Sequence, residues 1–468
     1  MTGTPSEHKF PGLLDILARN PRRPFQQTQA EALRQLRTLL DHAYRHVPLY
    51  RRLWDDAGVR PDQVATTSDL AHFPMVDKDM IVDASDDAKD ERVVGVELDG
   101  MSTSGTSGRA ITMLRTAAEM RVTRRSFLRA LVYNGLRPWH RTVTFASTWL
   151  SSKKGAIVSK IARVRHIHPK DSLDRQIDLL KSFRARNLIG QTGGVYLLAR
   201  ELLRRGMTHR LHALIPTGAT LMPQMRQAMR DAFLTEPRDL YGAVELGAVS
   251  WQGPCGNYHV DSDRIIVEIV DEHGRPVPDG RKGQVVCTSL YGMSVPLIRY
   301  RLLDVSALHA TGPESGGRGC ACSCGIQFPT MDVVRGRIND FLPTASGDLV
   351  SPHFLYHVFD HVGGSPVKEW RIIQEQLDHL VYEYIPEDRF DAEAFRGGMD
   401  VIRKRFGAET RVEPVEVNAI PMTPNGKRTC IVSRLERTGH EGMRPWDGVD
   451  EQGMFARPAE QATEALST

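Results

Sequence analysis

The chain has 468 residues, of which 41% are hydrophobic and 25% are charged, a composition typical of globular proteins with more than one domain. Its 61 basic and 57 acidic residues nearly balance, so the average charge gives no reason to expect a nucleic-acid partner. The sequence shows neither a signal peptide nor an apolar run long enough to cross a membrane, so we expect a cytoplasmic protein without a membrane partner.

The first part of the chain predicts helices followed by a parallel sheet. Between Gln29 and Ala57 apolar residues recur at helical spacing, with a break at HVPLY. Beyond them, β-rich runs such as RTVTFAST and LIGQT alternate with helical stretches such as DRQIDLLKSFRAR, which is the pattern of βαβ units. From Arg264 onward two strands joined by a Gly/Pro turn indicate a β-rich subdomain.

The last part predicts a separate small domain. The strand-like runs EWRIIQEQ and HLVYEYI precede a helix, DAEAFRGGMDVIRKRF, and a further strand near EPVEVNAI. We therefore expect an α/β protein with a large N-terminal α/β domain of residues 1–336, which has parallel sheets and a β-rich subdomain. A small mobile α+β C-terminal domain of residues 337–439 and a polar tail of residues 440–468 would complete it.

The segment STSGTSG, residues 102–108, contains only serine, threonine and glycine. Small residues let the backbone approach a ligand closely, and the amide and hydroxyl groups of such a loop can surround phosphate oxygens. The spacing and the lysine of a Walker A loop are absent. Taken alone, a segment of this composition is more often a flexible connection.

Further segments follow this loop in a fixed order: PTGATL (216–221), LYGAVELG (240–247), PLIRYRLLD (296–304) with RGRINDF (335–341), and PMTPNGKR (421–428). With long passages between residues 35 and 435, they resemble the adenylate-forming superfamily of acyl-CoA synthetases, most closely its phenylacetate-CoA ligase branch. The resemblance implies an AMP-forming ligase that uses ATP and Mg²⁺ to activate a carboxylic acid, an aromatic one in this branch. It also implies coenzyme A as the acceptor.

The resemblance assigns roles to individual positions. The phosphates of ATP would be held by the loop residues Thr103, Ser104, Gly105, Thr106, Ser107 and Gly108, with Thr106 among the catalytic residues. Gly218 and Ala219 would lie against adenine, and Tyr241, followed by Gly242, would stack on its other face. Glu245 would bind Mg²⁺, whose preferred ligands are oxygen atoms.

The remaining roles lie later in the chain. Asp304 would accept hydrogen bonds from the ribose hydroxyls, and Arg337 would contact ribose and phosphate. Asn339 would be the hinge between the domains, and Lys427 would reach the carboxylate and the α-phosphate during adenylation.

Two departures from the family pattern stand beside these matches. Val244 replaces the usual threonine or serine, and RYRLLD replaces RYRTGD, so that Leu302 and Leu303 occupy two small-residue positions. The alternatives therefore stay open: an acceptor such as a carrier protein, an amine or nitrite in an aryl-amine diazotase, or a non-catalytic nucleotide-binding relative.

The cysteines suggest a metal site. In CACSCG the residues Cys320, Cys322 and Cys324 would be too far apart on an extended strand, whereas a turning loop could bring two or three together. Cys255 and His259 could complete a tetrahedral set, and some phenylacetate-CoA ligase relatives hold a structural zinc with a comparable cysteine pair. We expect Zn²⁺ at Cys255, His259, Cys322 and Cys324, with Cys320 as a substitute. Reduced thiols without a metal are the competing interpretation.

Three aromatic side chains, Tyr133, Trp139 and His140, are candidates for the acyl pocket. The identity of the acid, the acceptor and the oligomeric state, a homodimer included, stay open.

Overall fold

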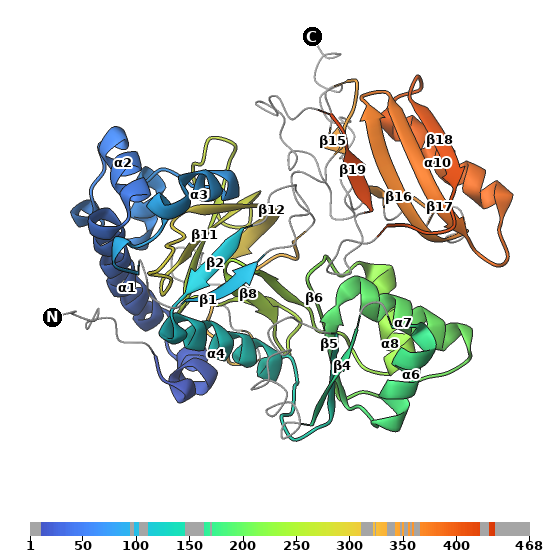
Figure 1. The fold of residues 1–468 in the computed structure, drawn as a ribbon, viewed down its shortest axis with the longest axis horizontal. Helices are drawn as coiled ribbons and strands as arrows, with labels where there is room; N and C mark the ends of the chain where they lie inside the picture. Colours follow the sequence, from blue (N-terminus) through green and yellow to red (C-terminus); the bar gives the residue numbers. More distant parts are fainter. Residues whose placement is uncertain are drawn as a thin grey trace, which may run out of the picture. The chain divides into compact units, whose positions relative to one another are not determined.

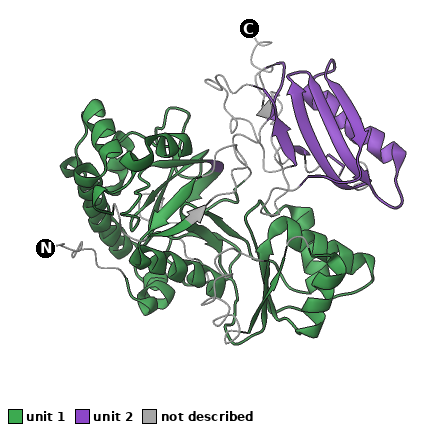
Figure 2. Cartoon of the chain, in the orientation of Figure 1, with its two compact units in different colours: residues 1–302, 306–334, 423–427 green, residues 303–305, 335–422, 428–468 purple. Residues whose placement is uncertain are grey.

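The computed structural model describes residues 11–93, 98–102, 111–145, 163–168, 171–309, 322, 324–334, 342–346, 349–350, 354–355, 358–359, 366–421 and 430–435. These residues form two compact units (Figure 2). The larger unit contains the described residues up to 334 except 303–305, and the smaller unit contains 303–305 and the described residues from 342 onward.

Helices cover the start of the chain: α1 (Phe25–His46), α2 (Pro48–Ala57) and α3 (Lys78–Ala84), with the short turns η1 (Asp15–Arg19), η2 (Asn20–Arg22), η3 (Pro61–Gln63), η4 (Thr67–His72), η5 (Ser85–Ala88) and η6 (Glu91–Val93). Helix α1 buries Leu36, Leu39, Leu40 and Ala43, whose spacing places them on one face. Pro48 starts α2 at a position where a helix needs no amide donor. The expected break at HVPLY is confirmed.

Eleven strands, which lie in the larger unit apart from residues 303–305 of β12, form one mixed sheet in the order β10-β11-β12-β13-β9-β8-β7-β6-β5-β3-β4. Figure 1 labels β4, β5, β6, β8, β11 and β12 of this sheet. The strands on the parallel side are β3 (Thr142–Phe145), β4 (Val164–Ile167), β5 (Asn187–Gln191), β6 (Ala213–Thr217) and β7 (Leu240–Ala243). Their helices are α6 (Leu173–Ser182), α7 (Thr192–Arg204) and α8 (Pro223–Phe233). Leu188, Leu198, Leu214 and Phe233 are part of the apolar core between these strands and helices. The alternating pattern in the sequence therefore gives the parallel sheet that it predicts.

The other side of the sheet contains β8 (Gly247–Gln252), β9 (Tyr258–Val260), β10 (Ile265–Val270), β11 (Lys282–Ser289), β12 (Tyr300–His309) and β13 (Thr330–Met331). Strands β10 and β11 pair antiparallel, with Ile265 opposite Ser289, so the expected β-rich part is confirmed. Helix α4 (Ala117–Tyr133) packs against β8, and a separate hairpin is formed by β1 (Asp99–Ser102) and β2 (Thr112–Arg115).

The smaller unit is an α+β structure. Its sheet has the order β18-β17-β16-β19, built from β16 (Val367–Gln376), β17 (His379–Pro386), β18 (Arg411–Glu416) and β19 (Ile431–Ser433), and it is accompanied by α10 (Ala392–Phe406) and the short pair β14 (Leu342–Pro343) and β15 (Leu349–Val350). Ile372, Leu380, Tyr382 and Ile402 belong to its core. The expected fold class is confirmed. No helix in the described part of the chain combines the length and apolar character needed to span a bilayer.

Candidate active site and metal centre

The segment PTGATL forms the end of β6 and the turn that follows it. Gly218 has φ +82°, which glycine adopts without the strain that a side chain would add. Thr192, the first residue of α7, donates through Oγ1 to the carbonyl oxygens of Thr217 at 3.3 Å and Ala219 at 3.0 Å. The turn is thereby fixed at the carboxyl end of β6, the edge of a parallel sheet at which ligands commonly bind.

Tyr241 and Gly242 lie next to this turn. Thr217 is the register partner of Leu240 and donates through Oγ1 to its carbonyl oxygen at 2.8 Å, so Tyr241 follows directly beyond the end of β6. A Cβ atom on Gly242 would lie 2.3 Å from the carbonyl oxygen of Gly247, so only glycine permits this close approach of β7 and β8. The structure thus brings the predicted adenine-binding residues to one edge of the sheet.

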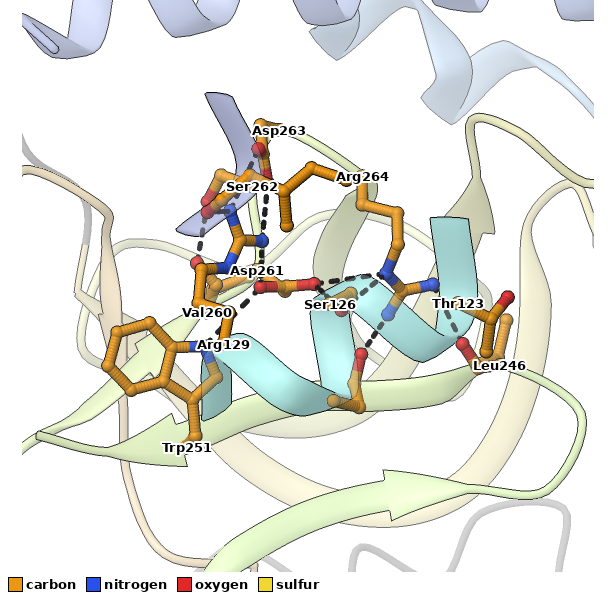
Figure 3. A network of polar contacts seen from close by, with 12 residues as sticks. Thr123, Ser126, Arg129, Leu246, Trp251, Val260, Asp261, Ser262, Asp263 and Arg264 are labelled. Atoms are coloured by element: carbon orange, nitrogen blue, oxygen red, sulfur yellow. Dashed lines mark hydrogen bonds and ion pairs between the residues drawn. The ribbon is translucent and has the colours of Figure 1, made fainter. Parts of the chain in front are cut away.

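Glu245 lies in the turn between β7 and β8, and two buried arginines hold the main chain of that turn. Arg115 donates to the carbonyl oxygen of Glu245. Arg264 donates to the carbonyl oxygens of Leu246, at 2.7 Å, and of Ala248 (Figure 3). Within the described residues, no hydrogen bond or ion pair uses the partly exposed carboxylate of Glu245. Its oxygens are therefore available to a hard cation.

Arg115 also connects this turn to the β1–β2 hairpin. It is the last residue of β2, and β1 pairs with β2 so that Ser102 lies opposite Thr112. The loop residues are the connection between these two strands. Burial and the charge of Arg264 lower the pKa of Arg115 to about 10, while Glu119 and Glu245 oppose this shift. Arg115 was not predicted as a site residue, because nothing in its local sequence distinguishes it from a surface arginine.

A buried ionic network supports Arg264 (Figure 3). Arg264 Nε donates to Asp261 Oδ2 at 3.0 Å, and Arg129 donates to Asp261 and to both carboxylate oxygens of Asp263. Trp251 Nε1 donates to the Asp261 carboxylate at 3.3 Å. Burial acts to raise the pKa of Asp261, but the charges of Arg129 and Arg264 hold it below its usual value. The aspartate therefore remains an acceptor that fixes the Arg264 guanidinium.

Asp304 lies on a different part of the sheet, since β13, β9 and β8 come between β12 and β7 in the strand order. Its side chain is buried. The preceding residue, Leu303, has φ +61°, in the left-handed region that favours glycine. Leucine therefore has a left-handed backbone at the position where the family pattern has glycine.

Several predicted residues fall outside the described part of the chain: Thr103, Ser104, Gly105, Thr106, Ser107, Gly108, Cys320, Arg337, Asn339 and Lys427. Their roles stay predictions. Of the candidates for the acyl pocket, Trp139 and His140 precede β3, at the amino ends of the parallel strands, while the Tyr133 ring lies 4.8 Å from that of Trp251.

The structure brings together the four predicted metal ligands, Cys255, His259, Cys322 and Cys324, with their ligand atoms within 4.8 Å of one another. His259 Nε2 lies 3.3 Å from Cys255 Sγ and 3.4 Å from Cys324 Sγ, and the sulfur atoms of Cys322 and Cys324 are 2.8 Å apart. A turn at Gly325, which has φ +74°, accompanies the two neighbouring cysteines. Three sulfur atoms and one imidazole nitrogen are a donor set that suits tetrahedral Zn²⁺.

Neighbouring groups orient this donor set. His259 Nδ1 lies 3.4 Å from the carbonyl oxygen of Phe328, an arrangement that directs Nε2 toward the sulfur atoms. A Cβ atom on Gly253 would lie 3.2 Å from His259 Nε2 and 3.3 Å from Cys255 Sγ. The absence of a side chain at this position leaves the space between the two ligands open.

Comparisons with known proteins agree with these features. Residues 342–434 match the CapK C-terminal domain family. The phenylacetate-coenzyme A ligase of Thermus thermophilus is 25% identical over 341 residues, which are 69% of this chain and 72% of that protein. The phenylacetate-coenzyme A ligase of Escherichia coli is 26% identical over 334 residues, 68% and 72% of the two chains. Protein CapK of Staphylococcus aureus is 23% identical over 273 residues, 57% of each chain.

Solved structures show the same architecture. A 2-hydroxyisobutyryl-CoA ligase in the postadenylation state, in complex with R3-HIB-AMP, superposes with a TM-score of 0.71 at 19% identity, over 89% of this chain and 91% of that one. ATP-bound MatB from Rhodopseudomonas palustris gives a TM-score of 0.50 at 15% identity, over 70% and 66%. The resemblance seen in the sequence is confirmed: the chain has the fold of these adenylate-forming CoA ligases, and its sequence is similar to those of phenylacetate-CoA ligases.

Proposed function

We propose that this protein activates a carboxylic acid with ATP and transfers the acyl group to coenzyme A. The contact from Arg115 to the Glu245 carbonyl oxygen carries the proposal, because it joins the hairpin that flanks the hydroxyl loop to the turn of the expected Mg²⁺ ligand. The sequence relatives favour an aromatic acid such as phenylacetate.

Activation is needed because a carboxylate is a poor electrophile at neutral pH. A carboxylate oxygen would attack the α-phosphorus of ATP, the bond to the bridging β-phosphate oxygen would break, and pyrophosphate would leave. In the second step the sulfur of coenzyme A would attack the acyl carbon, AMP would leave, and the thiol proton would pass to solvent. AMP is a far better leaving group than the oxide ion that an unactivated carboxylate would have to expel.

The residues of this chain would bind and orient the reactants. The hydroxyl loop would hold the β- and γ-phosphates, Tyr241 and the Gly218 turn would enclose adenine, and Asp304 would bind the ribose. Lys427 would neutralise charge on the phosphoryl oxygens as pyrophosphate leaves. Glu245 would hold Mg²⁺, which supplies positive charge to the phosphate oxygens when bound.

ATP–pyrophosphate exchange over a panel of aryl and aliphatic acids tests the first step. We expect exchange with an aryl acid, and a loss on the order of a hundredfold in Lys427→Ala, because a charge that acts in the transition state is removed. Lys404→Ala removes an exposed lysine of α10 and should leave the rate unchanged. Absence of exchange with every acid, or full activity in Lys427→Ala, would favour a non-catalytic nucleotide-binding relative.

AMP release in the presence of different acceptors tests the second step. With an acid that supports exchange, coenzyme A should stimulate AMP release and yield a thioester. Release that requires an amine, nitrite or a carrier protein instead would replace coenzyme A in the proposal and leave the adenylation step intact. Val244 and the Leu302–Leu303 pair are the departures that make these acceptors worth measuring.

We also propose that Cys255, His259, Cys322 and Cys324 bind one structural Zn²⁺, which their donor chemistry and their separation support. Elemental analysis of the purified protein should find about one zinc per chain. The double variant Cys322→Ser/Cys324→Ser should lose the metal and melt at a lower temperature. Cys430→Ser removes a cysteine outside this cluster and should retain it. If the purified protein contains no zinc and the double variant is as stable as the unmodified chain, the competing interpretation of reduced thiols without a metal would be supported.

A further inference from the structure

A row of basic residues marks the amino ends of four neighbouring parallel strands. Arg163 precedes β4, Arg141 precedes β3, Arg186 precedes β5 and His212 precedes β6. Backbone hydrogen bonds join these positions: Thr142 N donates to Arg163 O at 3.0 Å, Arg186 N to Arg141 O at 2.8 Å and His212 N to Arg186 O at 2.6 Å. Adjacent strands lie roughly 4.8 Å apart, so the four side chains start from one closely spaced line.

Three further arginines extend this basic edge. The guanidinium of Arg165 lies 5.3 Å from the centre of the Phe183 ring, and that of Arg141 lies 6.0 Å from the same ring. Arg137 lies 5.9 Å from the Trp139 ring. Arg184 is exposed just before β5. We use the name basic edge for Arg137, Arg141, Arg163, Arg165, Arg184, Arg186, His140 and His212.

Acidic residues are missing from this part of the chain. Residues 120–170 contain eight arginines and four lysines but no aspartate or glutamate. In the described part of the chain, no carboxylate forms an ion pair with any arginine of the basic edge. Carboxylates close to the ends of α7 and α8 are already engaged, since Glu201 pairs with Arg204 and Glu236 with Arg226. The near-balance of charge over the whole chain conceals this segregation.

The basic residues of this edge lie close enough to affect one another's ionisation. His212 lies 4.7 Å from His140, ring centre to ring centre. Partial burial and the charges of His140, Arg137 and Arg186 lower the pKa of His212. Like charges so close together repel one another, and a surface of this kind attracts and concentrates anions.

An exposed tryptophan lies within the same surface. Trp139 is 68% exposed, the highest value among the exposed large hydrophobic residues of the described chain. Its ring lies 6.1 Å from that of His140, and Asn187 Nδ2 donates to the Arg137 carbonyl oxygen at 3.1 Å, which holds this segment over the start of β5. Tryptophan next to arginine is typical of proteins that lie on a lipid surface, where the indole sits at the headgroup level.

We propose that the basic edge binds the surface of an anionic lipid bilayer, with its arginines on headgroup phosphates and Trp139 in the interface. A single-stranded nucleic acid is less well matched, because stacking requires successive open aromatic faces, and Phe183 is flanked by two guanidinium groups. Such binding places the chain on a membrane without a spanning helix. It is independent of the ligase activity proposed above, since the arginines of the basic edge have no part in that chemistry.

Co-sedimentation with vesicles tests the proposal. The full chain should bind vesicles of phosphatidylglycerol and phosphatidylcholine at low salt, bind pure phosphatidylcholine vesicles poorly, and dissociate as the salt concentration rises. The variant Arg163→Gln/Arg184→Gln/Arg186→Gln should bind on the order of a hundredfold more weakly, because each arginine contributes separately to attraction by the surface. These side chains are exposed, so the melting temperature should not change.

A control matched in charge separates the basic edge from general electrostatics. Arg34→Gln/Arg45→Gln/Arg52→Gln removes three exposed arginines from α1 and α2 and should bind vesicles as the unmodified chain does. The emission of Trp139, obtained by subtracting the spectrum of Trp139→Phe, should shift to shorter wavelength on binding. No binding to anionic vesicles, equal weakening in both triple variants, or tighter binding to DNA than to vesicles would overturn the proposal.

Discussion

Leu303 has a backbone conformation that favours glycine. Its φ of +61° costs a side-chain-bearing residue about 1–2 kcal/mol relative to glycine. The variant Leu303→Gly should therefore be more stable than Leu303→Ala by about 1 kcal/mol. At the neighbouring buried position the order should reverse, with Leu302→Ala more stable than Leu302→Gly by about 0.5–1 kcal/mol. Melting temperatures of the four single variants measure this reversal. The same order at both positions would contradict it.

Asp239 gives the stability of the larger unit a pH dependence. Its buried carboxylate accepts hydrogen bonds from Tyr258 Oη and the Leu240 amide, both at 2.9 Å, and burial raises its pKa from 3.8 to about 6. Between these values the unfolded chain releases the proton and the folded chain retains it, so stability falls as pH rises and levels off above about pH 6.

Asp239→Asn cannot titrate and should lack this dependence. Relative to the unmodified chain, the variant should gain about 2.4 kcal/mol of unfolding free energy between pH 4 and pH 7, since one pKa unit corresponds to about 1.4 kcal/mol and the unfolded carboxyl is already more than half ionised at pH 4. Denaturant melts of both proteins across this range measure the difference. A difference that does not vary with pH would show that Asp239 ionises equally easily in the folded and unfolded chain.

At the scale of elements, Arg115 connects the β1–β2 hairpin to the turn between β7 and β8. Arg115→Met should lower the rate of pyrophosphate exchange on the order of ten- to a hundredfold, because displacement of Glu245 by about 1 Å misplaces a binding group. Exchange kinetics at several MgATP concentrations measure the effect, which should raise KM for MgATP more than it lowers kcat.

A stability control belongs with this variant. Met229, on α8, is fully buried in the apolar core between the parallel strands and their helices. Met229→Ala should therefore lose about 2–5 kcal/mol of stability. Below its melting temperature it should retain normal exchange kinetics. If both variants change KM alike, Arg115 acts only through stability and has no positioning role.

Most helices and strands were readily predicted from the sequence. The helices α1 and α2, the alternation from β3 to α7, the pair β10 and β11 and the strands of the smaller unit all carry local patterns of apolar spacing, glycine and proline. These patterns depend on neighbours a few residues away. The hydrogen bonds that hold the Glu245 turn join residues more than 15 positions apart, and no local pattern indicates them.

For the whole molecule, the hinge expected at Asn339 predicts that the two proposed steps respond differently to a change at that residue. Asn339→Pro restricts φ at the expected hinge, so it should retain pyrophosphate exchange within about threefold and reduce thioester formation by at least about tenfold. Asn339→Ala, which leaves the backbone free to rotate, should preserve both steps. Equal losses in both steps would mean that residue 339 is not the hinge.

Short-range features of the sequence were sufficient for the fold class, the resemblance to adenylate-forming ligases and the four residues that cluster as Cys255, His259, Cys322 and Cys324, because spacing and motif order can be read without knowledge of the fold. The folded chain alone revealed which charges are buried, as with Arg115, Arg129 and Arg264, and which lie close together with no ion pair to a described carboxylate, as at the basic edge. Burial and local charge density depend on which segments the sheet brings together. The overall composition, in which basic and acidic residues nearly balance, does not show them.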